Sequence, residues 1–251
     1  MKKALKTTLI VFIWLVIWLV ASLLINLPLL FPSPIDVLVR LFQLLGTSEF
    51  YLSTMFSFGR IILGITIGLL SGLAIALLCS ISKHIYDFFM PLIAIVKSTP
   101  IVAFVFLVNL FVGSGYTIVF ICVLMVFPIV FANIYQGIIG TDKNLLELCK
   151  VYKIPYKKRL KALYLPGVAP YFFSSLLSSI GLAWKAGIAA EILCTPRISI
   201  GIEIFNAKTY IEYIDLFAWI LTVVILSLIF ELVVTKLLKL LSNKFLTKAE
   251  V

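Results

Sequence analysis

Three charged side chains interrupt long apolar stretches of this sequence: Lys97, Lys185 and Glu191. A charge inside a membrane-spanning helix is costly unless it faces water, an oppositely charged partner or the interior of a helix bundle. Lys185 and Glu191 stand six residues apart, which is close to two helical turns, so they do not pair simply within one helix. We therefore expect Lys185 and Glu191 either to pair with other helices and fix assembly, or to line a wet path or gate. Lys97 precedes Pro100 by three residues, so it either snorkels from a helix that the proline kinks or lines the path.

The residues that usually carry catalysis, metal binding or ATP hydrolysis are not grouped in this chain. The four cysteines lie far apart without a CxxC spacing, and the single histidine, His84, follows Lys83 in what we expect to be a short solvated loop. No GxxxxGK[ST] motif occurs, so any ATP hydrolysis must come from another chain. We predict no catalytic, cofactor-binding or metal-binding residue, and a chain that is not by itself an enzyme. A membrane-embedded ion channel or enzyme using Lys97, Lys185 and Glu191 is the alternative function.

The elements that must position these charges are membrane-spanning helices. Of the 251 residues, 63% are hydrophobic, which excludes a soluble globular domain. Because one helical span of a bilayer takes about 20 apolar residues, the sequence predicts an all-α, polytopic membrane protein with about six transmembrane helices. The expected spans cover residues 9–30, 58–79, 86–112, 116–135, 169–193 and 214–238.

Two local patterns add detail to these spans. Ser33 can cap a helix, Pro34 suits its first position and Gly46 can end it, so a short amphipathic helix is expected along the outer membrane surface. In the second span, glycines four residues apart from Gly64 to Gly72 allow another helix backbone to approach closely. That pattern predicts tight helix packing and carries no information about a substrate.

The basic residues are distributed unevenly around the expected spans. The formal net charge is +10. If both termini lie inside, most lysines fall on inner ends and loops, and the outer side keeps only Arg40, Arg60, Arg197 and Lys208. This asymmetry follows the positive-inside rule and predicts that both termini are cytosolic. The positive charge therefore indicates membrane orientation, and we expect no nucleic-acid partner.

One long polar segment, Glu147 to Pro166, falls on the cytosolic side in this orientation. It and its flank carry apolar residues at helical spacing in two groups: Leu145, Leu148, Cys149 and Tyr152, then Tyr156, Leu160, Leu163 and Tyr164. Pro155 separates the groups, because proline lacks a backbone donor and pushes Ile154 out of the α region. We expect two short amphipathic helices that meet at an angle and whose apolar stripes need a partner.

The order of residues in this segment resembles the "EAA" loop of permease subunits of bacterial ATP-binding-cassette importers. Glu147 stands at the acidic position and Leu165-Pro166 at the end, while Leu148-Cys149 replaces the usual small pair and Lys153 the usual turn glycine. In that family the loop is a coupling helix that seats in a groove of the ATPase subunit. The resemblance implies that the ATPase-coupling residues are Glu147, Leu148, Cys149, Tyr152, Lys153, Pro155, Leu165 and Pro166.

Further stretches are similar to the nitrate, sulfonate, taurine and bicarbonate branch of this binding-protein-dependent type I family. They are Pro32-Ser33-Pro34, Ala183-Trp184 with Ala190-Glu191, and Ser199 to Glu203, which is similar to a glycine-rich re-entrant piece. The family also shows a basic residue, two small or β-branched residues and a proline where this chain has Lys97, Ser98, Thr99 and Pro100. The resemblance implies that these four residues, with Trp184, Lys185 and Glu191, form the translocation path or a gate.

For the whole chain, the resemblance implies a multi-pass subunit of a bacterial cell-membrane importer. It implies a second permease copy as a homodimer, or a related subunit, two cytosolic ATPases that carry ATP and Mg, an extracytoplasmic substrate-binding protein and surrounding membrane lipid. We expect a single transmembrane permease domain, 1–251, with a first span and outer helix (1–57), a core (58–238) containing the coupling loop (137–167), and a cytosolic tail (239–251). Lys97 and Lys185 suit a small anionic or polar solute, whereas Glu191 argues against an anion.

Overall fold

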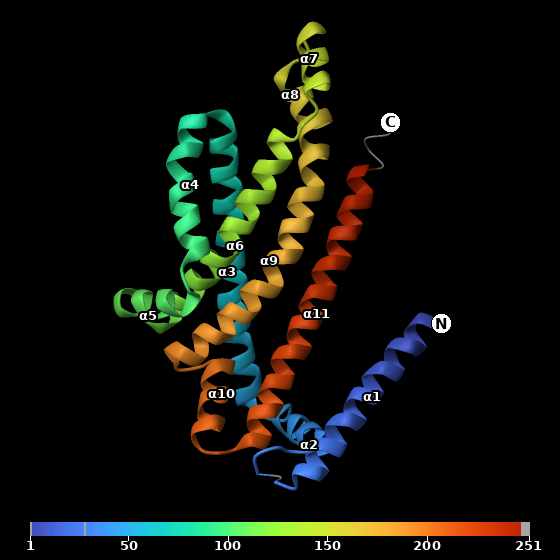
Figure 1. The fold of residues 1–251 in the computed structure, drawn as a ribbon, viewed down its shortest axis with the longest axis vertical. Helices are drawn as coiled ribbons and strands as arrows, with labels where there is room; N and C mark the ends of the chain where they lie inside the picture. Colours follow the sequence, from blue (N-terminus) through green and yellow to red (C-terminus); the bar gives the residue numbers. More distant parts are fainter. Residues whose placement is uncertain (1, 28, 247–251) are drawn as a thin grey trace. The chain divides into compact units, whose positions relative to one another are not determined.

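The computed structural model describes residues 2–27 and 29–246 and, within them, the side chains of residues 5–27 and 29–240. These residues form helices and no strand (Figure 1). The last residues of the predicted tail, 247–251, with Lys248, lie outside the described residues. In chain order the helices are α1 (Lys2–Ile25), α2 (Pro34–Leu44), α3 (Ser48–Ile81), α4 (Lys83–Ser98), α5 (Ile101–Val112), α6 (Ser114–Ile139), α7 (Lys143–Val151), α8 (Tyr156–Arg159), the π-helical turn η1 (Leu160–Tyr164), α9 (Leu165–Cys194), α10 (Ile200–Thr209) and α11 (Tyr213–Leu246).

The helices confirm a polytopic all-α membrane protein. Among the described residues, five helical stretches are long and apolar enough to span a membrane, and the bent pair α4 and α5 makes a sixth candidate. They overlap the six predicted stretches, and five are longer than predicted because their polar ends continue the helix. The first, by contrast, ends at Ile25, before the predicted end at residue 30. The stretch that contains α9 begins at Tyr156, where the sequence predicted a start near residue 169.

The third expected span is not one straight helix. The axes of α4 and α5 differ by 104° across Thr99-Pro100. Pro100 has no N–H to donate to the turn before it, and Thr99 accordingly takes an extended conformation, with φ −80° and ψ 132°. In Figure 1, α5 turns sharply away from α4. The predicted proline kink is therefore a full break.

Close packing of α3 against α6 follows from the predicted glycines. A Cβ added to Gly64 would lie 2.4 Å from the Cβ of Cys122, and one added to Gly68 would lie 2.7 Å from the Cβ of Val126. Gly72 meets Val130 in the same way, at 2.8 Å. The glycine spacing predicted this contact correctly, because only a residue without a side chain lets the two backbones come this near.

The chain divides into two compact units, residues 1–57 with 195–226 and residues 58–194 with 227–251. In the first unit, α2 begins as predicted: the hydroxyl of Ser33 accepts the backbone N–H of Asp36, and Pro34 is the first helical residue. Arg40 of α2 donates two hydrogen bonds to the carboxylate of Asp215, with N···O distances of 2.6 and 2.7 Å. These bonds raise the pKa of the Arg40 guanidinium above its ordinary value.

The segment after α9 also belongs to the first unit and forms the helix α10. Ser199 caps it by accepting the N–H of Ile202, and the N–H of Ile200 donates to the hydroxyl of Ser57 at 2.9 Å. The stretch Ser199 to Glu203, which is similar to a glycine-rich re-entrant piece, therefore forms the capped start of α10. The hydroxyl of Ser53 donates to the carboxylate of Glu203 at 3.3 Å.

Candidate functional site

Glu191 of α9 is fully buried in the second unit, and its partner is Arg60 of α3. Nη1 of Arg60 donates to Oε1 of Glu191 at 3.2 Å, and the side chain of Arg60 is 19% exposed. Removing one member of such a pair leaves an uncompensated buried charge, a loss of about 3–5 kcal/mol. Of the two alternatives expected for Glu191, a partner on another helix or a wet path, the structure shows a partner on another helix. The sequence signal for this pair was two opposite charges in different apolar spans, although Arg60 was counted only among the basic residues of the outer side.

The face of α9 that carries Glu191 is packed tightly against α3 and α6. One turn before Glu191, a Cβ added to Gly187 would lie 2.8 Å from Cγ1 of Ile61 and 3.0 Å from Sγ of Cys122. Two turns before it, Trp184 is 1% exposed, and its ring lies 5.9 Å from the ring of Phe58. Trp184 and Glu191 thus belong to the interior of the helix bundle.

Lys185 is exposed, although its neighbours Trp184 and Ala186 are buried. Among the described residues, Lys185 makes no hydrogen bond or ion pair. The same side of α9 exposes Ser174 and Ser178. The structure therefore separates Lys185 from Glu191: one charge is paired inside the bundle, and the other lies on the helix surface.

Lys97 is exposed at the last turn of α4, directly before the break. The hydroxyls of Ser98 and Thr99 donate to the carbonyl of Ile95 at 3.1 and 2.8 Å and so satisfy the end of the helix. Neither Lys97 nor Lys185 pairs with Glu191 in the part of the chain that the structure describes. Lys97 therefore ends α4 on the surface beside Pro100.

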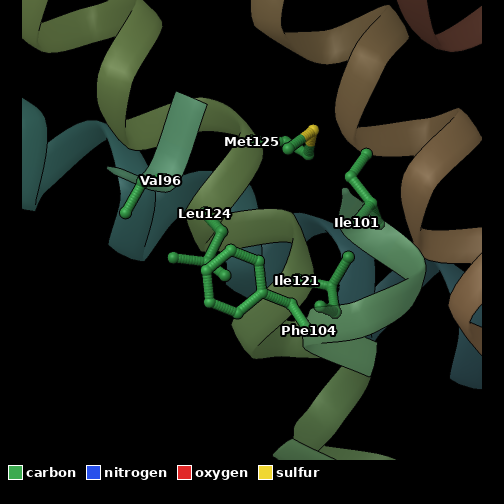
Figure 2. Close-up of a pocket in the computed structure, with 6 residues that line it drawn as sticks. All are labelled: Val96, Ile101, Phe104, Ile121, Leu124 and Met125. Carbon is green, nitrogen blue, oxygen red and sulfur yellow. The ribbon is translucent and has the colours of Figure 1, made fainter. Parts of the chain in front are cut away.

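A small hollow lies where the broken pair α4 and α5 meets α6. Figure 2 shows its lining, which comes from the end of α4, the start of α5 and the middle of α6: Val96, Ile101, Phe104, Ile121, Leu124 and Met125. All six side chains are apolar, so this hollow offers no group that would bind a charged or hydrogen-bonding solute. It reflects the packing of the bend on the hydrophobic core.

The second candidate site is the segment from α7 to the start of α9. Figure 1 shows α7 and α8 together at one end of α6 and α9. Asp142 caps α7 by accepting the N–H of Asn144 at 2.8 Å. No residue of α7 is buried, and Leu148 and Tyr152 are 50% and 74% exposed. The helix thus presents an apolar stripe with nothing from its own unit to cover it, as the sequence predicted.

Lys153 makes the turn after α7. Its φ is +50°, in the left-handed region that favours glycine. The N–H of Ile154 donates to the carbonyl of Cys149 and the N–H of Lys153 to that of Lys150, at 2.9 and 3.0 Å. This is the Schellman pattern that ends a helix. Lys153 therefore performs the turn that the resemblance assigns to glycine, and Pro155 then begins the next helix as its N-cap.

Leu165 and Pro166 do not end a loop, because the helix runs on through them. α8, η1 and α9 are continuous from Tyr156 to Cys194. The N–H of Leu165 donates to the carbonyl of Leu160, five residues earlier. Pro166, the next residue, has no N–H to donate to the carbonyl four residues earlier. The π-helical turn η1 therefore lies where the regular α-helical hydrogen bonding is interrupted. In the structure, the pair lies in the first turn of α9.

The profile of a protein family described as binding-protein-dependent transport system inner membrane component matches residues 64–246, which include α6, α7 and α9. The chain belongs to this permease family. The match covers α3 from Gly64 onward, α6, the break, the exposed α7 and the face of α9 with Lys185.

Relatives of the permease agree with this assignment. A protein of Haemophilus influenzae named "Probable ABC transporter permease protein" is 30% identical over 229 residues, 90% of this chain and 92% of the relative. The taurine transport system permease protein of Escherichia coli is 24% identical over 224 residues, 86% of this chain and 80% of the relative. Other relatives are named for nitrate and bicarbonate transport, so the predicted branch is confirmed.

A solved structure shares the fold of the permease. It is described as the crystal structure of an amino acid ABC transporter with histidines, and the alignment has a TM-score of 0.59 and 18% sequence identity. The alignment covers 76% of this chain and 92% of that chain. This likeness supports the arrangement of helices alone.

Proposed function

We propose that this permease forms the translocation path of an ATP-binding-cassette importer for a small anionic or polar solute, and that α7 and α8 couple it to a separate ATPase. The observation that carries the proposal is the exposed apolar stripe of α7, held by a capped start and a Schellman end at the tip of the second unit. A membrane channel or an enzyme has no need of such a docking element. With Glu191 buried and paired, the channel or enzyme alternative also loses one of its three charges.

The partners follow from the family and from the charge pattern. The family name includes binding-protein-dependent transport, which supports an extracytoplasmic substrate-binding protein. The lysine distribution supports cytosolic termini and a cytosolic α7. We propose two permease copies as a homodimer in a bacterial cell membrane, and two ATPase subunits that bind ATP and Mg. The permease itself holds no cofactor.

The solute class is supported by the relatives and by Lys185. The printed names of relatives include taurine, nitrate and bicarbonate, and each of these solutes carries a negatively charged group. Lys185 is an exposed cation on a predicted span. Lys97, Ser98, Thr99 and Pro100 complete the proposed path at the break between α4 and α5. We assign Trp184 and Glu191 to the support of this path.

A matched pair of α7 variants tests the coupling role. Leu148→Glu places a charge in the apolar stripe, whereas Lys150→Glu makes a larger charge change about 200° around the helix. We expect Leu148→Glu to lower the yield of co-purified ATPase at least tenfold, and Lys150→Glu to lower it less than threefold, because burying an unpaired carboxylate is costly. The measurement is the permease to ATPase ratio after detergent purification of the complex expressed from neighbouring genes.

Two results would contradict the proposal. If the permease purifies folded and alone from such a co-expression, it has no ATPase partner among those genes. If Leu148→Glu retains the ATPase as well as Lys150→Glu does, the stripe of α7 is not the docking surface.

A further inference from the structure

The rotation of α9 about its own axis decides which of its charges meets the solute. Successive residues of an α-helix are turned by about 100°, so Lys185 and Glu191, six residues apart, point about 120° away from each other. Ser178, seven residues before Lys185, and Ser174, eleven before it, point within about 20° of Lys185. One face of α9 therefore carries Glu191, and a different face carries the lysine with two serines.

The Glu191 face cannot rotate freely, because three contacts hold it. Glu191 pairs with Arg60, Gly187 leaves no space for even one methyl group between α9 and its neighbours, and Trp184 packs on Phe58. The ion pair is the polar member of this set. An unpaired carboxylate has no stable place in an apolar bundle, so Glu191 must keep its orientation toward α3.

The charge on the other face is not compensated on α9. The charges of Arg60 and Glu191 offset each other in the interior, and Lys185 is left as a positive charge on the face that also exposes Ser174 and Ser178. A lysine with two serines in the middle of a spanning helix is a poor surface for lipid chains. The face fits water and a negatively charged solute.

We propose that Lys185 contacts the solute and selects anions, and that the Arg60–Glu191 pair is the positioning element that turns Lys185 toward the path. The proposal rests on the proposed function, since it needs a translocation path beside α9. It assigns different roles to the two charges: Lys185 meets the solute, while Glu191 acts through the orientation of α9. It also removes the conflict between Glu191 and an anionic solute.

The test measures the electrostatic field along this face and needs no knowledge of the solute. Ser178→Cys is introduced into the permease in its complex with the ATPase and labelled with two methanethiosulfonates, one bearing a sulfonate and one a trimethylammonium group. The labelling rates at position 178 are read by mass spectrometry of the peptide and divided by the rates for glutathione. Ser175→Cys is the matched control, since Ser175 is buried on the same helix.

We expect position 178 to be labelled, position 175 to stay unlabelled, and the anionic reagent to react faster at position 178. Residues 178 and 185 are about 10 Å apart along the helix, so replacing Lys185 by Gln should lower the anion-to-cation ratio about fivefold. Lys185→Arg should keep the ratio. An unlabelled position 178, or a ratio that does not depend on Lys185, would overturn the anion-selecting role.

The positioning role has its own readout. Glu191→Gln and Arg60→Gln should each lower the labelling rate of position 178 and expose position 175, because α9 loses its fixed rotation. The exchange of both charges, Arg60→Glu with Glu191→Arg, should restore the pattern. A purely structural pair would lower the yield of the complex and leave the labelling pattern of the surviving complex unchanged, which would refute positioning.

The two proposals fail in different ways. All labelling is done on complexes whose ATPase is still coupled to the permease, so that a missing ATPase counts against the importer function. A coupled complex with no anion preference counts against Lys185 alone.

Discussion

At the scale of single residues, the backbone angle φ of Lys153 sets the direction in which the chain leaves α7. This φ of +50° is unfavourable for any residue with a Cβ, and β-branched side chains tolerate this region least. The hydrogen bonds of the turn are nevertheless complete. The hydrogen bonds of the turn therefore hold Lys153 at a positive φ. This conformation costs free energy that a glycine would not lose.

Variants of Lys153 test this cost. Lys153→Gly should keep the ATPase bound and stabilise the turn by about 1 kcal/mol, whereas Lys153→Val should destabilise it by about 1–2 kcal/mol and weaken coupling. The measurement is the ATPase activity stimulated by the permease, together with the amount of ATPase that co-purifies. Lys150→Val is the matched control, because its site lies within the helix, where valine costs only tenths of a kcal/mol. Equal loss in both valine variants would contradict the role of the angle.

Glu203 is a second residue whose environment has a measurable consequence. Burial and the nearby carboxylate of Glu49 raise its pKa above the ordinary value, and the hydrogen bond from Ser53 offsets part of the rise. The native state therefore binds this proton at a higher pH than the unfolded state does. Its contribution to stability is greatest at acidic pH and is lost as the pH rises through the raised pKa.

Glu203→Gln should therefore raise the melting temperature at pH 7.5, because the charged carboxylate no longer has to be partly buried. The advantage over the unchanged protein should shrink as the pH falls toward the unfolded-state pKa of about 4.3. Thermal unfolding in detergent, followed across this pH range, measures the difference. Glu49→Gln should reduce the same pH dependence by removing the neighbouring charge. A Glu203→Gln variant that is less stable at pH 7.5 would argue against a raised pKa for Glu203.

At the scale of elements, the glycines of α3 fix how closely this helix meets α6. A Cβ on Gly64 would lie 2.4 Å from a Cβ of α6, a distance at which one backbone must move. Gly59, five residues earlier on α3, has no atom within 4 Å of its added Cβ. The two positions differ in packing while sharing one helix.

Gly64→Ala should therefore lower the stability of the second unit, by about 1–3 kcal/mol for an overpacked core. Gly59→Ala should be neutral or stabilising by up to about 1 kcal/mol, since alanine is the better helix former. Melting temperatures of both variants in detergent measure the contrast. If Gly64→Ala proved as stable as Gly59→Ala, the close approach of α3 and α6 would be incorrect.

At the scale of the whole molecule, the helices differ in how much of their apolar surface the rest of the chain covers. Only 6% of the apolar window of α1 and 17% of that of α11 are buried, against 50% for α6. Such apolar surface must be covered by lipid or by another chain. The permease is therefore built from one well-buried helix pair, α6 and α9, and from helices whose surroundings supply much of their contact.

Composition and short sequence patterns predicted the class of the protein, the six apolar stretches, the capped start of α2 and the place of the break at Pro100. Each of these follows from composition or from residues close in the chain, because hydropathy, capping and the missing N–H of proline act locally. The resemblance of Glu147 to Pro166 also located the exposed α7 before any contact was known. Its end at Leu165-Pro166, however, lies inside a continuous helix.

Which charges face each other depends on how the helices pack in three dimensions. Sequence reasoning left Lys185 and Glu191 as equal candidates for the path, because the rotation of a helix is set by the helices packed against it. Glu191 pairs with Arg60, 131 residues earlier, so Glu191 lies in the interior of the bundle. The 104° angle between α4 and α5 was likewise beyond local rules, since proline marks where a helix breaks and packing on α6 sets how far it turns.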